Sequence, residues 1–195
     1  QDPAVIVIFG ATGDLTWRKL FPSLFSLYRN NLLPQHVCIV GASRSKLSHD
    51  EFRDLMRRSV EPAPNTEPSG WEGLSSRIFY HQTSLDNQED FLRLHSFLEE
   101  LDATFATRGN RLFYLAVPST VVPSIAHQLG QSGLSREDPE KGNWVRFAVE
   151  KPFGHDLESA RELDRTLHSS FAEHQIFRID HYLAKETVQN ILMLR

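Results

Sequence analysis

Six short apolar runs divide the chain, and the longer segments between them carry apolar residues at helical spacing. The first run, Ala4–Phe9, is unbroken and rich in β-branched residues. This pattern is typical of a central parallel strand that is covered on both faces. The remaining runs, which we predict to be further strands, are 37–40, 77–80, 112–117, 144–149 and 176–179.

The segments between these runs predict helices. Ser48 and Glu51 have the spacing of a capping box for a helix that ends at Val60, and Asp86 is the predicted cap of a helix that reaches Ala106. The other predicted helices are 15–30, 119–129, 156–171 and one that begins near residue 183, while 61–73 is predicted to be a loop. Strand and helix alternate throughout, which predicts an α/β fold, a Rossmann-like doubly wound parallel sheet.

Composition narrows the class of protein without naming a function. The 195 residues suffice for one domain, and 40% hydrophobic and 24% charged residues are ordinary for a globular protein. A net charge of −4 argues against a general nucleic-acid partner, and no run predicts a membrane span or a signal peptide. Cys38 is the single cysteine, so no disulfide is expected, and we expect it to be buried. These features favour a cytoplasmic protein, and no metal site is predicted.

A glycine-containing turn follows the first predicted strand and opens a helix. It comprises Gly10, Ala11, Thr12, Gly13, Asp14 and Leu15. Glycines let the backbone approach a pyrophosphate, and a helix N-terminus supplies amide donors. The spacing departs from the common G-x-G-x-x-G pattern, and a structural turn without a ligand is the alternative. Asp14 is anionic, so its simplest role is to cap the helix.

The segment after the second predicted strand indicates which dinucleotide this turn would bind. An acidic residue there would hold the ribose 2′-hydroxyl of NAD. Instead the chain carries Arg44, flanked by Ser43 and Lys46, and has no acid between Asn31 and His49. The Arg44 guanidinium can form a bidentate contact with a 2′-phosphate, Ser43 can donate a hydrogen bond and Lys46 adds charge, so these residues favour NADP.

Two further motifs follow the fifth and sixth predicted strands. Glu150–Gly154 contains Lys151, which lies where it can reach both a nicotinamide and a substrate hydroxyl. The second motif, 178–186, holds Asp180, His181, Tyr182 and Lys185. His181 and Lys185 can bind a phosphate, and Asp180 can orient a histidine base, although no histidine of this chain is an obvious partner.

Three motifs in this order, Phe9–Leu15, Glu150–Gly154 and Arg178–Glu186, resemble the N-terminal part of glucose-6-phosphate dehydrogenase. The resemblance implies that Gly10 to Leu15, Arg44 and Lys151 bind NADP. It further implies that Lys151, His181, Tyr182 and Lys185 bind glucose 6-phosphate, while Asp180 orients the base histidine. The implied product is 6-phosphogluconolactone, in the first oxidative step of the pentose phosphate pathway. Ala184 stands where the family has glycine, and Thr16 where it usually has alanine.

The resemblance also implies that the chain is a fragment. We interpret 1–195 as the NADP-binding domain, ending in the start of the substrate-binding region at 178–186. The family's C-terminal α+β domain, which carries the base histidine and the interface of a homo-oligomer, is then absent, so we expect the chain alone to be inactive. Two alternatives stay open: a non-catalytic NADP-sensing module, which has no need of the 178–186 cluster, and a dehydrogenase acting on a different hexose.

Overall fold

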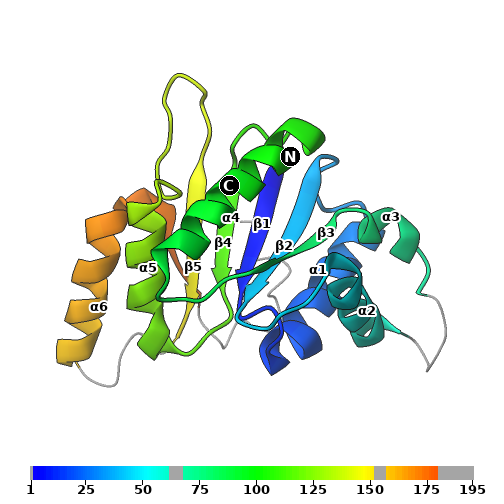
Figure 1. Cartoon of the computed structure of the whole chain (residues 1–195), viewed down its shortest axis with the longest axis horizontal. Coiled ribbons are helices and arrows are strands. Elements are labelled where there is room, and N and C mark those ends of the chain that lie inside the picture. The colour runs from blue at the N-terminus through cyan, green and yellow to red at the C-terminus, as the bar shows by residue number, and fades with distance from the viewer. Residues whose placement is uncertain (1, 62–67, 152–156, 180–195) are drawn as a thin grey trace.

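The computed structural model describes residues 2–61, 68–151 and 157–179. These residues form a six-stranded parallel sheet in the order β3-β2-β1-β4-β5-β6. Its strands are β1 (Ala4–Phe9), β2 (Val37–Ser43), β3 (Ile78–Gln82), β4 (Arg111–Leu115), β5 (Val145–Glu150) and β6 (Ile176–Ile179). Successive strands are added on one side of β1 up to β3 and on the other side from β4 onward (Figure 1). This confirms the predicted doubly wound sheet.

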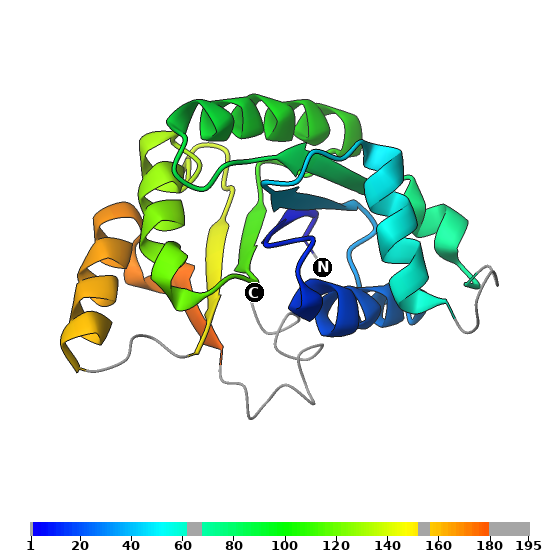
Figure 2. The ribbon, with the colours of Figure 1, turned by 60° about the horizontal axis from the view of Figure 1, so that its bottom comes forward.

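Helices cover both faces of the sheet (Figure 2). The helices are α1 (Phe21–Arg29), α2 (His49–Val60), α3 (Trp71–Ser75), α4 (Gln88–Phe105), α5 (Val122–Gln131) and α6 (Leu157–Ser170). A π-helical segment, Thr16–Leu20, precedes α1, and the 3₁₀ turns Ser119–Val121 and Glu173–Gln175 precede α5 and β6. Apolar residues of α1 to α3 pack on one face of the sheet, and those of α4 to α6 pack on the other.

β1 lies at the centre because both of its faces are apolar. Val5, Val7 and Phe9 contribute to the core beneath α4 to α6, whereas Ile6 and Ile8 contribute to the core beneath α1 to α3. All of them are at most 5% exposed. Burying each such side chain contributes about 1.5–3 kcal/mol, so the unbroken apolar run fixes the position of this strand. Cys38 on the neighbouring β2 is also buried, as predicted.

β2 extends beyond the predicted end at residue 40 and continues through Gly41 to Ser43. A Cβ on Gly41 would lie 2.3 Å from the Phe52 ring of α2 and 2.9 Å from Ala11 Cβ. Gly41 therefore does not end the strand. It leaves space for a helix and a turn to pack closely against it.

The capping box at Ser48 is confirmed, but two other predictions about helix limits were wrong. Ser48 Oγ accepts from the Glu51 amide at 3.2 Å, and Glu51 Oε2 accepts from the Ser48 amide at 2.7 Å. The cap of α4 is Asn87 rather than Asp86, since Asn87 Oδ1 accepts from the Glu89 amide at 3.0 Å. The predicted loop 61–73 contains the start of α3, which buries Trp71 against α1 rings.

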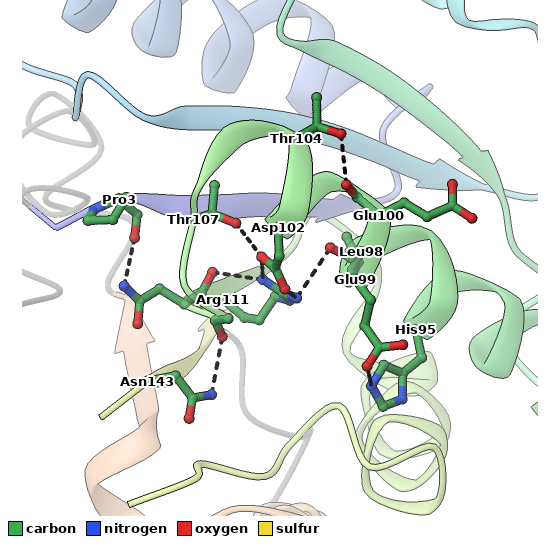
Figure 3. Close-up of polar contacts among 12 residues, drawn as sticks. Pro3, His95, Leu98, Glu99, Glu100, Asp102, Thr104, Thr107, Arg111 and Asn143 are labelled. Carbon is green, nitrogen blue, oxygen red and sulfur yellow. Dashed lines mark hydrogen bonds and ion pairs between the residues drawn. The ribbon is translucent and has the colours of Figure 1, made fainter. Parts of the chain in front are cut away.

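The edge of the sheet where the strands begin is held together by a polar cluster (Figure 3). The Arg111 guanidinium makes a bidentate contact with the Asp102 carboxylate of α4, including a 2.6 Å bond to Oδ1. Thr107 donates a further hydrogen bond to the same carboxylate. A hollow of about 680 Å³ opens beside this cluster. Because Arg111 and Asp102 satisfy one another, the cluster has a structural role in fixing α4 against β4.

Among the described residues, no helix is both long and apolar enough to cross a membrane, and no group of three or more metal-ligating side chains occurs.

Candidate cofactor site

The carboxyl ends of β1, β2 and β4 surround a cavity of about 500 Å³. This is the point where the strand order reverses, and open α/β sheets bind their ligands at such a point. Residues from both sides of the reversal line the cavity: Gly10, Thr12, Gly13, Ser43, Arg44, Ser45, Leu85, Asp86, Ala116, Val117, Pro118, Val121 and Ser124. It therefore joins the glycine turn to Arg44, as the sequence predicts, and adds an apolar wall formed largely by the segment after β4.

Gly10 occupies a position that only glycine can fill. Its φ is +80°, and a Cβ would lie 2.2 Å from the Ala116 carbonyl oxygen. The Gly10 amide donates to Ala42 O at 3.0 Å, and the Gly13 amide donates back to Gly10 O at 2.9 Å. The turn is thus closed tightly on itself and leaves its outer face open to the cavity. A backbone without side chains at this place fits the pyrophosphate of a dinucleotide.

A chain of hydroxyl groups runs from the cavity into the sheet. Thr12 Oγ1 lies 3.1 Å from Ser43 Oγ, which lies 2.7 Å from the Tyr80 hydroxyl. The Tyr80 hydroxyl in turn contacts the carbonyl oxygens of Ser45 at 2.5 Å and Ser43 at 3.2 Å. Ser43, predicted as a hydrogen-bond donor to the phosphate, lines the cavity, and its hydroxyl is already hydrogen-bonded to Thr12 and Tyr80. Burial raises the pKa of Tyr80, so its hydroxyl stays a donor at neutral pH.

Arg44 is exposed at the mouth of the cavity. Within the described part of the chain it forms no ion pair, so its charge is available to an anion. Gln82 Nε2 donates to the Arg44 carbonyl at 3.3 Å. Lys46 is also exposed but lies outside the lining of the cavity.

Three residues of the predicted turn do not line the cavity: Ala11, Asp14 and Leu15. Ala11 is fully buried beneath the turn. Asp14 pairs with Arg18 at 2.6 Å, both side chains being largely exposed, so it does not make the side-chain cap that was its simplest expected role. The Arg18 guanidinium also offsets the negative charge of Asp14 near the predicted phosphate site.

Thr16, which departs from the family pattern, has a defined role in this turn. Its side chain is fully buried, and Oγ1 donates to the Gly10 carbonyl at 3.2 Å. Thr16 begins the π-helical segment, and such segments often occur at functional sites. The extra hydroxyl thus ties the start of the helix to the glycine turn.

Lys151 lies at the carboxyl end of β5 and is exposed. Its amide donates to the Ile179 carbonyl of β6 at 3.2 Å, which joins the ends of these two strands. The preceding residue, Glu150, accepts a hydrogen bond from the buried Tyr114 hydroxyl of β4. Burial, followed by the nearby Glu150 carboxylate, raises the pKa of Tyr114. Lys151 is therefore on the same edge of the sheet as the glycine turn, as predicted.

The predicted substrate residues Asp180, His181, Tyr182 and Lys185 lie outside the described residues, as do Ala184 and the 152–154 part of the lysine motif. Their roles stay predictions. Arg178, at the start of the motif, is described. Its guanidinium binds Asp164 of α6 at 2.6 Å and Glu173 at 2.9 Å, which fixes β6 against α6 at the start of the motif.

Two histidines near β3 illustrate why the sequence offers no obvious base. His49 Nδ1 accepts from the Tyr80 amide at 3.0 Å and its ring stacks on Phe97, while His81 Nδ1 bonds to the Thr83 hydroxyl at 2.8 Å. Burial lowers the pKa of both histidines. Both side chains are satisfied structurally, in agreement with the sequence interpretation.

Several residues that support or line the site could not be predicted from the sequence. Tyr80 and Gln82 reach the Arg44 segment from β3, and Leu85, Val117 and Val121 form the apolar wall. Tyr80 lies near the end of β3, and β3 is next to β2. This position predicts a contact with the Arg44 segment only when the strand order is known, because the sequence alone does not show which strands are neighbours.

Fold and site together define a dinucleotide-binding domain of the Rossmann type. The sequence matches the model of "Glucose-6-phosphate dehydrogenase, NAD binding domain" over residues 7–190. The chain belongs to the glucose-6-phosphate dehydrogenase family. A nicotinamide dinucleotide is accordingly the cofactor class of this domain.

Individual relatives agree with this assignment. The chain is 44% identical to glucose-6-phosphate 1-dehydrogenase of Chlamydia muridarum over 99% of its own length and 39% of the relative's. It is 43% identical to the enzyme of that name from Aggregatibacter actinomycetemcomitans, over 97% of this chain and 38% of the relative. A solved glucose-6-phosphate dehydrogenase in complex with glucose-6-phosphate superimposes with a TM-score of 0.83 at 39% identity and covers 100% of this chain and 40% of that one. The chain thus spans about two fifths of the length of these relatives.

Proposed function

We propose that this chain is the cofactor-binding part of an NADP-dependent dehydrogenase that oxidises glucose 6-phosphate to 6-phosphogluconolactone. The reaction is the first oxidative step of the pentose phosphate pathway, and we expect the full-length protein to be a cytoplasmic homo-oligomer. The observation that carries the cofactor assignment is that Arg44 and the Gly10–Gly13 turn line the same cavity. The relatives' names and the substrate complex support the reaction.

The residues of this chain fit a bound NADP. The Gly10 turn gives the pyrophosphate a close approach, and the Arg44 guanidinium can pair with a 2′-phosphate. When bound, NADP supplies the carbon that accepts a hydride from the sugar. Lys151, at the end of β5, would contact both the cofactor and the sugar, and would hold the C1 hydroxyl in place.

The substrate half of the proposal rests on 178–186. His181, Tyr182 and Lys185 would bind the 6-phosphate, and the binding energy gained there would position the distant C1 carbon. Asp180 would orient a histidine that removes the C1 hydroxyl proton, in the manner of a carboxylate–histidine pair. That histidine would be supplied by the remainder of the full-length protein, so we expect no measurable turnover from the 195-residue chain alone.

Cofactor binding tests the first half of the proposal directly. Arg44→Ala in this chain should weaken NADP binding at least about tenfold, the loss of one charge-assisted phosphate contact, and should change NAD binding little. Arg58→Ala, which removes an exposed guanidinium of α2 outside the cavity lining, is the matched control. Equal losses for NADP and NAD would reject the assignment.

The second half is tested in the full-length protein. His181→Ala and Lys185→Ala should each raise the KM for glucose 6-phosphate. An unchanged KM in both variants would show that the phosphate assignment is wrong and would favour a different hexose substrate. NADP binding without any dehydrogenase activity in the full-length protein would favour the non-catalytic sensing module.

A further inference from the structure

We propose that Tyr80 is a positioning residue that sets the preference for NADP, by holding the segment that carries Arg44. The inference rests on the proposed role of Arg44 and extends it to β3, a strand that does not line the cavity. Tyr80 is 4% exposed, so it acts through its contacts rather than by touching the cofactor.

Groups of β3 and of the residue that follows it bind each carbonyl of the Arg44 segment. Tyr80 Oη donates to Ser45 O at 2.5 Å, Gln82 Nε2 donates to Arg44 O, and the Thr83 amide donates to Ser43 O at 2.8 Å. Three consecutive peptide carbonyls are therefore anchored from the neighbouring segment. An exposed, long side chain such as Arg44 binds a phosphate more tightly when its backbone is already held, because ordering the backbone on binding costs entropy.

The hydroxyl chain has a definite direction. A phenol has one hydrogen, and the 2.5 Å contact to Ser45 O is closer than the 3.2 Å contact to Ser43 O, so Tyr80 donates to Ser45. Ser43 Oγ must then donate to Tyr80 Oη, and Thr12 Oγ1 must donate to Ser43 Oγ. The direction is fixed by the Ser45 carbonyl, which can only accept.

This direction links the two halves of the site. Thr12 lines the cavity beside the glycine turn, and Ser45 lies beside Arg44 at its other end. Removing the Tyr80 hydroxyl frees the Ser45 carbonyl and deprives the buried Ser43 hydroxyl of its acceptor. Both changes loosen the Arg44 segment, whereas the Gly10–Gly13 turn keeps its own backbone bonds.

The test separates the 2′-phosphate from the rest of the cofactor. Adenosine 2′,5′-bisphosphate and adenosine 5′-monophosphate differ only in that phosphate, and their affinities for this chain can be compared by titration calorimetry. Tyr80→Phe keeps the ring that packs on Phe52, 5.1 Å away between centroids. This variant should bind the bisphosphate about three- to tenfold more weakly, as expected for the loss of one or two hydrogen bonds. Its affinity for the monophosphate should change less than about twofold.

Two further variants serve as a control and as an independent test. Tyr28→Phe, which removes a phenol hydroxyl without a hydrogen bond in the described part of the chain, should leave the ratio of the two affinities unchanged. Gln82→Leu alters an exposed side chain and, like Tyr80→Phe, should lower the affinity for the bisphosphate relative to that for the monophosphate. If Tyr80→Phe does not fold, the result for Gln82→Leu tests the proposal in its place.

Arg44→Ala distinguishes the two proposals. If Arg44→Ala abolishes the preference for the bisphosphate while Tyr80→Phe and Gln82→Leu retain it, the positioning role is wrong and the NADP assignment stands. If Arg44→Ala leaves the preference intact, the NADP assignment itself fails, and Tyr80 has no phosphate-binding segment to position.

Discussion

Tyr114 of β4 donates its hydroxyl hydrogen to the carboxylate of Glu150 on β5. The tyrosine is 1% exposed, and the bond lies one residue before Lys151. Tyr114→Phe should lower the free energy of unfolding by about 1–2 kcal/mol, because a charge-assisted hydrogen bond is lost in a buried place. Urea denaturation would measure this, with Tyr28→Phe as the control for losing a phenol hydroxyl. Equal stability of the two variants would contradict the role given to this bond.

The glycine turn yields a prediction about two similar substitutions. Gly10→Ala places a Cβ 2.2 Å from a backbone oxygen at a φ of +80°, whereas Gly13→Ala places one 3.1 Å from Gly10 O. We expect Gly10→Ala to cost about 2 kcal/mol or more and Gly13→Ala at most about 1 kcal/mol of unfolding free energy. Equilibrium denaturation of both variants checks the difference. A Gly10→Ala variant as stable as Gly13→Ala would show that the turn rearranges freely.

The Arg111–Asp102 pair at the opposite edge of the sheet should be costly to break. The Arg111 side chain is 6% exposed, so Asp102→Ala leaves a buried guanidinium without its counter-charge and should cost about 3 kcal/mol. Glu89→Gln on the same helix disrupts a largely exposed pair with Arg93 and should cost less than about 0.5 kcal/mol. Nucleotide affinity of folded Asp102→Ala should equal that of the unaltered chain, since the pair is remote from the cavity.

His168 at the end of α6 should make stability depend on pH. Its Nδ1 lies 2.8 Å from the Asp164 carbonyl and its Nε2 lies 2.7 Å from a Glu173 carboxylate oxygen. Both partners only accept, so the imidazole binds both when it is protonated. The hydrogen bond to Asp164, followed by that to Glu173, raises the pKa of His168 above its ordinary 6.5.

A raised pKa stabilises the fold at low pH. The contribution of His168 is complete below the unfolded pKa and is lost as pH rises through the folded pKa. The pKa of Glu173 is lowered by Arg178 and His168, so its contribution is present above the unfolded carboxyl pKa and is lost as pH falls through the lower folded value. Stability of the unaltered chain minus that of His168→Gln should therefore decline as pH rises past neutrality. An NMR titration of His168 with a midpoint at or below 6.5 would contradict this.

The sequence predicted the sheet well because burial on two faces leaves a strong local pattern. Ala4–Phe9 is observed with the limits expected from its apolar run. The pattern failed at Gly41, where a glycine serves close packing against Phe52 rather than a turn, and at Asp86, where the next residue caps the helix. The first error arises because a tertiary contact overrides a local preference, and the second because two adjacent residues, Asp86 and Asn87, are both good caps.

Part of the candidate site could also be predicted from local sequence patterns. Gly10 and Arg44 each follow a strand, so the rule that parallel strands end at one edge was enough to bring them together. Tyr80, Gln82 and Thr16 act through hydrogen bonds to carbonyl groups, and nothing in their sequence neighbourhood points to those partners. Ser43 is the opposite case. Its hydroxyl is of a type that suits a phosphate, but it is already hydrogen-bonded to Tyr80 in the interior.

Because β1 lies at the centre of the sheet, its two edges find their partners at different times during synthesis. β1 pairs with β2, which follows it closely in the chain, but its other side pairs with β4, with Val5 opposite Arg111. At typical synthesis rates, the roughly hundred residues between them take about 5–20 s to emerge from the ribosome. During that interval the β4-facing edge of this apolar strand has no partner, and an exposed apolar strand edge is a place where another chain can pair.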